Sequence, residues 1–258
     1  MKSISPVFMF HALYNVASEL YDADSHYAIT VSEFEELVAH LVSNNIEITS
    51  LCKLVETESL NEKNVCFTFD DGHISNYESA VPILLKYNAS ADFFINPAYV
   101  GNKGYIDWDG LRSMHASGMS IQSHGHHHYY FDDLDTATIR KELELSKMTI
   151  EDNLGSEVSI FAPPGGRITP AVKDIAFDLG YSAIATSRPG YWNSLTGTKD
   201  IPRLAVLANT SSEEMYAWAS TDRSGLYKIV AKYSITRIAK KILGNKLYDR
   251  LRSAALSE

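Results

Sequence analysis

The stretch NVCFTFDDGH, residues 64–73, joins a short apolar run to two adjacent aspartates. Apolar runs of this length that are rich in aromatic and β-branched residues are typical of buried strands. We therefore expect a strand over 64–69, ending at Asp70 and Asp71. Three more runs end in the same way: His11 follows PVFMF, His124 follows MSIQS, and the segment PPGG at 163–166 follows VSIFA. Because the carboxyl ends of parallel strands carry the active site in α/β folds, we expect these groups to meet in one cleft.

Helical patterns separate the strand-like runs. Thr30 and Glu33 have the spacing of a capping box and predict a helix over 30–45. A long helix is expected over 135–154, closed by Gly155, and Thr169-Pro170 predicts the start of another. Strands alternating with helices favour parallel pairing with crossover helices, in an open sheet or a closed barrel. The sequence therefore predicts an α/β fold.

Composition narrows the class of partner. The 258 residues carry 23 Lys and Arg against 32 Asp and Glu, a formal net charge of −9. An acidic chain argues against nucleic acid as the main partner, because phosphate backbones require a basic surface. The first residues lack the apolar run and small-residue cleavage site of a signal peptide. The only two cysteines, Cys52 and Cys66, suit a reducing compartment, so we expect a cytoplasmic protein.

The C-terminal part of the chain differs in charge from the rest. Residues 228–258 are basic and carry a rough helical stripe of Ile and Leu, interrupted at Gly244-Asn245. We therefore expect two parts, a β/α domain over 1–220 and a basic helical tail over 221–258. The tail either packs as a terminal helix pair on the domain or contacts an anionic membrane face or a partner protein.

The densest chemical signal is the run HGHHH at 124–128. His124 and His128 are four residues apart, so one turn or a compact loop can direct both imidazoles at one point. Two histidines and one carboxylate make a three-ligand zinc site with a fourth position open to water or substrate. Asp70 and Asp71 can supply that carboxylate and divide two roles, one binding the metal and the other accepting a proton from the bound water.

These residues resemble the motifs of the polysaccharide deacetylases, carbohydrate esterase family four. Residues 68–72, TFDDG, look like the first motif, and 124–128 are similar to the second, H-[S/T]-x-x-H, with Gly125 in the Ser/Thr place. Residues 161–166, FAPPGG, are similar to the third, R-x-P-x-G, and shorter similarities occur at 9–11 and 202–204. The resemblance covers roughly residues 6–210 and implies a distorted (β/α) barrel of about seven units.

The resemblance also implies roles for individual residues. Asp71, His124 and His128 would hold one divalent metal, zinc, with cobalt, nickel or manganese as alternatives. Asp70 would be the general base, and the backbone N–H of Gly165 would donate to the oxyanion. The implied reaction is hydrolysis of N-acetyl groups on a sugar or glycan. With a cytoplasmic location, the expected substrate is a glycan precursor.

Two departures from the family pattern concern catalysis. The arginine of the third motif is Ala162 here, and no histidine follows His128 to serve as the general acid near the C-terminus. His11 is the best substitute for the acid, and a hydrogen-bonded core histidine is its alternative role. Trp192 is expected to line the sugar pocket as a family tryptophan does, or else to be a buried core indole.

Three alternatives keep part of this interpretation. A hydrolase of another small amide or cyclic imide would keep the fold and the metal. A pseudoenzyme that binds glycan or a partner would explain Ala162 and the absent histidine. A simple metal store would explain the histidines and leave the aspartate pair without a role.

Overall fold

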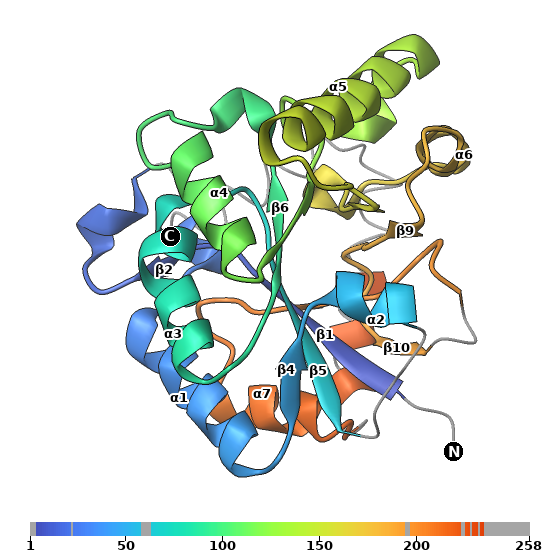
Figure 1. Ribbon diagram of the computed structural model, residues 1–258. Helices are drawn as coiled ribbons and strands as arrows, with labels where there is room; N and C mark the ends of the chain where they lie inside the picture. Colours follow the sequence, from blue (N-terminus) through green and yellow to red (C-terminus); the bar gives the residue numbers. More distant parts are fainter. Residues whose placement is uncertain are drawn as a thin grey trace, which may run out of the picture.

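The computed structural model describes residues 4–21, 23–57, 63–193, 197–222, 225–227, 229–231 and 233–234. The centre of the molecule is a mixed sheet that curves into a half-barrel, with helices on its outside (Figure 1). Nine strands form this sheet: β1 (Ile4–Phe10), β4 (Glu47–Thr49), β5 (Asn64–Phe69), β6 (Asp92–Ile95), β7 (Ser120–Ser123), β8 (Ile160–Phe161), β9 (Ala183–Ile184), β10 (Tyr191–Asn193) and β11 (Leu204–Ala205). A separate pair joins β2 (Leu13–Tyr14) to β3 (Ile29–Thr30).

The sheet order is β10-β1-β5-β6-β7-β8-β9, with β11 also paired to β1 and β4 also paired to β5. Every pairing is parallel except that of β10, which runs antiparallel to β1. Parallel pairing requires crossover connections, and the predicted helices supply them. The sequence prediction of an α/β barrel-type fold is confirmed, and the antiparallel β10 is an addition that it did not contain.

Seven α-helices are described: α1 (Val31–Ser43), α2 (Leu51–Thr57), α3 (Val81–Lys86), α4 (Trp108–Ala116), α5 (Thr136–Leu154), α6 (Pro170–Asp178) and α7 (Ser212–Ala219). A π-helical segment, Asn76–Ala80, leads into α3, and short 3-10 turns lie at Ala17–Leu20, Ser25–Tyr27, Pro97–Tyr99, Phe131–Asp133 and Pro164–Gly166. The predicted start of α1 and the predicted end of α5 are confirmed. The Thr30 hydroxyl accepts a hydrogen bond from the N–H of Glu33 at 3.2 Å, and α5 ends at Gly155, which has φ +66°.

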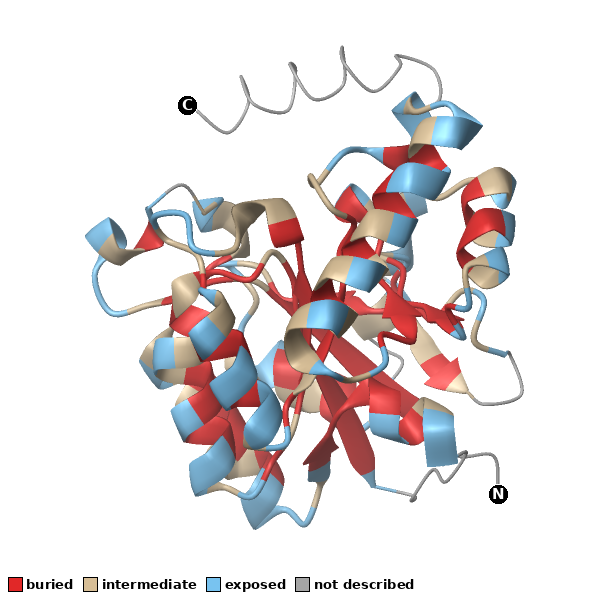
Figure 2. Ribbon diagram, turned by 45° about the horizontal axis from the view of Figure 1, so that its top comes forward, coloured by how far each residue is buried: buried red, intermediate tan, exposed pale blue. Residues whose placement is uncertain are grey.

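The strands are buried on both sides, and the helices expose only their outer faces (Figure 2). All six residues of β5 are buried, as expected for a parallel strand covered on both faces. Phe67 and Phe69 point to the helix side, where Phe69 stacks on Phe93 at 4.9 Å between ring centroids. Cys66 belongs to a second apolar cluster together with Ala162 and Trp192. This alternation directs Thr68 and Asp70 away from the aromatic layer, toward the inside of the half-barrel.

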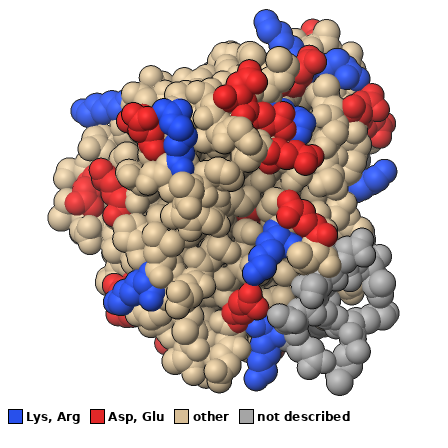
Figure 3. Space-filling view, viewed as in Figure 1, with Lys and Arg blue, Asp and Glu red and all other residues tan. Residues whose placement is uncertain are grey.

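No helix among the described residues is long and apolar enough to cross a membrane. Acidic and basic side chains are interspersed over the face shown in Figure 3. Most of the basic tail, including all of 235–258, lies outside the described residues. The division into a domain over 1–220 and a tail over 221–258 therefore stays a prediction.

Candidate active site

Backbone hydrogen bonds bring the four strand ends together. The N–H of Asp70 donates to the carbonyl of Phe10 at 2.9 Å, so the end of β5 lies against the end of β1. The N–H of Ala162 donates to the carbonyl of Ser123 at 2.9 Å, which places the third motif beside the second. The N–H of His124 donates to Ile95 on β6, which lies between β5 and β7. The expected convergence of sequence-distant motifs is present.

Asp71, His124 and His128 form a cluster whose ligand atoms all lie within 4.8 Å of one another. The Oδ1 atom of Asp71 is 3.3 Å from Nε2 of His124 and 3.2 Å from Nε2 of His128. Both Asp71 (φ +75°) and His128 (φ +58°) adopt left-handed backbone conformations, which turn their side chains inward at the ends of their loops. Burial raises the pKa of Asp71, but the two imidazoles beside its carboxylate outweigh burial and hold the pKa well below its usual range.

The hydrogen bonding of His124 fits a cation in this cluster. Its Nδ1 lies 2.7 Å from the carbonyl oxygen of Ala162, which can only accept a hydrogen bond. In the neutral imidazole the proton is therefore on Nδ1, and Nε2 directs a lone pair toward the carboxylate of Asp71. Two acceptors that face each other repel unless a cation lies between them. A backbone carbonyl behind a metal-binding histidine is the usual arrangement for fixing this tautomer.

The neighbouring histidine, His127, is held away from the cluster. Its Nδ1 lies 2.7 Å from Oε1 of Glu142, and its backbone N–H donates to Oε2 of the same residue at 2.9 Å. Glu142 is a buried residue of α5, so this contact ties the loop to the helix. The second motif thus presents His124 and His128 to Asp71 and turns His127 toward α5.

Asp70 lies next to this cluster and forms a buried, bidentate ion pair with Arg203. Nη1 of Arg203 donates to Oδ1 at 2.6 Å and Nη2 donates to Oδ2 at 2.9 Å. The side chains of Arg203 and Asp70 are 0% and 3% exposed. Burial raises the pKa of Asp70, but the guanidinium of Arg203, together with the imidazoles of His124 and His11, outweighs burial and lowers the pKa below the usual value. The carboxylate is therefore ionised and fixed in orientation.

Arg203 is the functional residue whose role the sequence did not reveal. It lies just before β11, and its Nε also donates to the carbonyl of Thr186 at 3.2 Å. The third-motif position that carries arginine in the family pattern, Ala162, is buried in the second apolar cluster instead. A single arginine in the short similarity at 202–204 was the only signal. The departure at Ala162 thus does not leave Asp70 without a guanidinium partner.

His11, the candidate acid, is at the end of β1 on the same edge of the sheet. Its ring packs on Tyr27 at 4.7 Å between centroids, and its buried Nδ1 has no hydrogen-bond partner among the described residues. Burial lowers the pKa of His11, and the carboxylates of Asp71 and Asp70 oppose that shift. A structural core histidine would have both ring nitrogens satisfied or exposed, so the bare Nδ1 favours a role at the site.

Gly165 and its neighbours form the third side of the site. Gly165 has φ +62°, and a Cβ there would lie 2.9 Å from Cε1 of Tyr130. The Tyr130 ring is 6.5 Å from that of His128, and the guanidinium of Arg167 lies 3.7 Å from the Tyr130 centroid. The glycine therefore lets Tyr130 pack directly on the loop that carries the expected oxyanion donor.

Trp192, expected to stack on a sugar, lies in the core. It is 2% exposed and belongs to the second apolar cluster. Its indole N–H donates to the carbonyl of Gly197 at 3.1 Å. Side chains of this cluster, such as Val7 and Cys66, surround the ring, which has no open face for a ligand. The alternative role, a buried indole, describes this residue.

Similarity to known proteins agrees with the site. Residues 57–184 match the polysaccharide deacetylase family model. A putative polysaccharide deacetylase of Bacillus subtilis, YxkH, is 25% identical over 83% of this chain and 75% of its own length. The poly-beta-1,6-N-acetyl-D-glucosamine N-deacetylase of Staphylococcus aureus is 25% identical over 61% of each chain. This chain thus matches less than two thirds of that relative's length.

Solved structures share the fold. The deacetylase PplD of Streptococcus pyogenes, in complex with acetate, superposes with a TM-score of 0.77 at 23% identity, over 85% of this chain and 99% of that one. IcaB from Ammonifex degensii gives a TM-score of 0.69 at 23% identity, over 84% and 98%. Because residues 57–184 match the family model and the curated relative YxkH carries the same family name, the chain belongs to the polysaccharide deacetylase family.

Proposed function

We propose that this protein is a metal-dependent hydrolase that removes N-acetyl groups from an N-acetylated glycan. The observation that carries the proposal is the pairing of two units: the Asp71, His124 and His128 cluster, and beside it the clamped carboxylate of Asp70. The first suits a divalent cation and the second suits a fixed base. A protein that only stores metal, or one whose site has lost activity, does not require the carboxylate of Asp70 held by Arg203.

Each protein group has a defined task in this reaction. A divalent cation held by Asp71, His124 and His128 would polarise the acetamide carbonyl and acidify a water. Asp70 takes the proton of the attacking water, because Arg203 keeps it ionised. The N–H of Gly165 donates to the oxygen on which charge develops. His11 protonates the leaving amine, which otherwise departs poorly. Zinc is the proposed metal because two imidazoles and one carboxylate are a common zinc ligand set.

The substrate class rests on the relatives. One curated relative is named for poly-beta-1,6-N-acetyl-D-glucosamine, and the family model is that of polysaccharide deacetylases. An N-acetylglucosamine-containing glycan is therefore the substrate to test first. A cytoplasmic location, and with it a glycan precursor as substrate, stays a prediction that cell fractionation with an antibody to the native protein tests.

The test combines metal content with acetate release. Untagged protein should bind about one equivalent of metal and release acetate from N-acetylglucosamine oligomers. Removal of the metal with a chelator should abolish the release, and zinc should restore it. Asp70→Asn should keep the metal and lose acetate release, because it removes the base and leaves the three ligands. A protein that binds metal and releases no acetate from any N-acetyl sugar, but hydrolyses a cyclic imide, would show that the amide class is wrong.

A further inference from the structure

The buried face of α5 carries two polar residues where apolar residues are expected. The buried residues of this helix are Ile139, Glu142, Leu143, Ser146 and Ile150, which follow the three- and four-residue spacing of a stripe that faces the core. Glu142 and Ser146 lie four residues apart in this stripe and are 4% and 0% exposed. A buried carboxyl group costs stability unless it is well hydrogen-bonded, so the partners of these two residues indicate their role.

Both polar residues hold the second motif. Oε2 of Glu142 accepts from the backbone N–H of His127 at 2.9 Å, and Oε1 lies 2.7 Å from Nδ1 of the same residue. One turn further along α5, the hydroxyl of Ser146 lies 2.8 Å from that of Ser123, which accepts from the N–H of Gly125 at 3.2 Å. The helix therefore fixes this motif at two points.

The segment that follows β6 holds the same motif through different groups. Nδ2 of Asn96 donates to the carbonyl oxygens of His124 and Gly125, at 2.7 and 3.1 Å. The hydroxyl of Tyr99 donates to the carbonyl of His127 at 3.3 Å. This segment therefore holds carbonyl groups of the motif, whereas the N–H of His127 is held from α5.

The backbone of His128 makes this support relevant to metal binding. His128 has φ +58°, a left-handed conformation that residues other than glycine rarely adopt. Such a conformation is unfavourable and persists only where the surrounding contacts hold it. Glu142 is itself fixed in the core, and it binds the N–H of the residue before His128, so it also fixes the direction in which the chain enters His128. In this way the imidazole of His128 comes to face the carboxylate of Asp71, at 3.2 Å.

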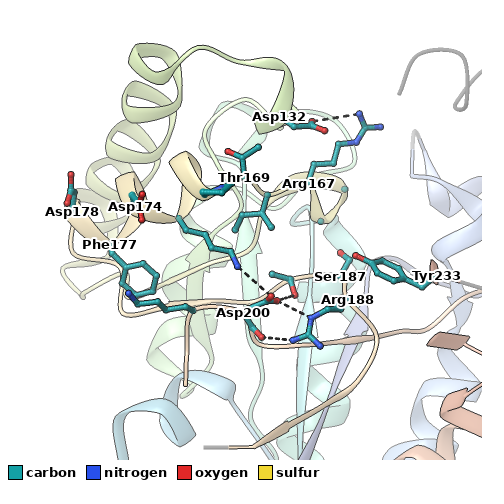
Figure 4. A pocket seen from close by; sticks show the side chains of 17 residues that line it. Asp132, Arg167, Thr169, Asp174, Phe177, Asp178, Ser187, Arg188, Asp200 and Tyr233 are labelled. Atoms are coloured by element: carbon teal, nitrogen blue, oxygen red, sulfur yellow. Dashed lines mark hydrogen bonds and ion pairs between the residues drawn. The ribbon is translucent and has the colours of Figure 1, made fainter. Parts of the chain in front are cut away.

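Glu142 is not placed to contact a substrate. Its side chain is buried, and the residues that line the cavity beside the third-motif loop do not include it (Figure 4). It is also not a member of the metal cluster, which consists of Asp71, His124 and His128 among the described residues. Any effect of Glu142 on the reaction must therefore pass through the position of the second motif.

We propose that Glu142, supported by Ser146 one turn away, is a positioning residue that holds the second motif in its metal-binding conformation. The inference rests on the proposed function in one respect, because it takes the cluster at Asp71 to hold a metal. It does not require the release of acetate. It predicts that metal affinity depends on the carboxylate through the main chain of His127 and not through the imidazole.

The experiment compares three variants of the full chain by competition with a chromogenic zinc chelator, which gives the Kd for zinc without turnover. Glu142→Leu suits the apolar stripe of α5 and should stay folded in urea unfolding, but it removes the acceptor for the N–H of His127. It should weaken zinc binding about tenfold or more, the usual effect of losing a group that supports a metal ligand. Glu142→Gln keeps an oxygen acceptor and should bind zinc nearly as tightly as wild type. His127→Ala keeps the N–H and should do the same.

Glu151→Leu is the matched control. Glu151 lies near the C-terminal end of α5 and also accepts from a backbone N–H, that of Val158 at 2.9 Å, so its replacement should leave the zinc affinity unchanged. Hydrogen exchange followed by mass spectrometry is the second measurement. The peptide that contains residues 124–128 should be protected from exchange in chelator-treated wild type. In chelator-treated Glu142→Leu it should exchange faster, and added zinc should restore part of the protection.

The outcomes separate this proposal from the proposed function. The role of Glu142 is refuted if Glu142→Leu binds zinc as tightly as wild type, or if Glu151→Leu weakens binding equally. It is also refuted if the 124–128 peptide of chelator-treated wild type exchanges as fast as an unfolded peptide, a result that does not depend on whether any variant folds. If wild type binds no zinc, the metal-dependent function fails, and hydrogen exchange alone decides whether Glu142 fixes the motif. If zinc binds but no N-acetyl sugar releases acetate, the deacetylase function fails, whereas the zinc affinities still test Glu142.

Discussion

Replacing Arg203 by methionine isolates the contribution of the buried ion pair. Methionine has nearly the length of arginine and leaves no charge beside Asp70. In the wild type both carboxylate oxygens accept from the guanidinium, at 2.6 and 2.9 Å, and the side chains of Arg203 and Asp70 are almost fully buried. Removing one partner of such a pair leaves the other charge without compensation and costs about 3–5 kcal/mol. The carbonyl of Thr186 also loses its donor.

The cost should depend on pH in a defined direction. The wild-type pKa of Asp70 is lowered, so the pair stabilises the fold above the ordinary aspartate pKa and loses that contribution as the pH falls through the folded value. Without Arg203, burial raises the pKa of Asp70, and the variant can protonate it in the folded state. The free-energy difference between wild type and Arg203→Met should therefore be largest near neutral pH and shrink in acid. The acid limb of acetate release should move to higher pH.

Urea unfolding at several pH values measures this difference. Arg140→Met is the control, because Arg140 pairs with Asp178 at 3.0 Å on the surface, with side chains 46% and 66% exposed. Exposed pairs contribute only about 0–1 kcal/mol. The double variant Arg203→Met/Asp70→Asn should recover much of the lost stability, since it removes the stranded charge. The reasoning is refuted if Arg203→Met costs no more than the control at neutral pH, or if its cost does not change with pH.

Three further changes test other parts of the molecule. Burial raises the pKa of Asp92 to about 7. Between about pH 4 and pH 8, the free energy of unfolding of the wild type in urea should therefore fall by up to about 4 kcal/mol relative to that of Asp92→Asn. A difference between the two proteins that is constant with pH contradicts this. Gly165→Ala sets a Cβ against Tyr130 at φ +62° and should cost about 1–2 kcal/mol and lower kcat with metal content unchanged, because the strained loop moves the Gly165 N–H; a normal kcat would show that catalysis does not depend on this loop conformation. His128→Ala should lose bound metal in equilibrium dialysis, whereas His127→Ala should retain it; equal retention would remove His128 from the ligand set.

Local signals in the sequence predicted the elements that carry the site. The capping box at Thr30 and the left-handed closure at Gly155 involve residues within one helical turn, and both are formed as expected. The strand over 64–69 has the predicted bounds. Because parallel pairing follows from the alternation of strands and helices, the convergence of the strand ends was also predictable.

Elements that depend on distant partners were not predictable in the same way. The strand β10 contains only three residues and exists because it pairs with β1, where Asn193 lies opposite Ile4. The helical segment over 76–86 is divided at Val81 into a π-helical part and α3, with Pro82 in the first turn of α3. Trp192 is buried because residues distant in the sequence, such as Val7 and Cys66, belong to the same apolar cluster.

The partner of Asp70 shows why a motif can lose a residue without losing its chemistry. A buried carboxylate that stays ionised requires a cation or hydrogen-bond donors nearby, but the requirement concerns position in space and not position in the chain. Ala162 follows β8 and packs into the apolar cluster, whereas Arg203 precedes β11, which pairs with β1 on the side opposite to β5. The guanidinium therefore crosses the end of β1 to reach the carboxylate at the end of β5. An alignment at the third motif alone would report a missing arginine and favour a decayed site. The bidentate contact from Arg203 instead supports a base that is held ready, since well-packed apolar residues in place of both partners often give equal or greater stability, and an inactive site has no need to keep the pair.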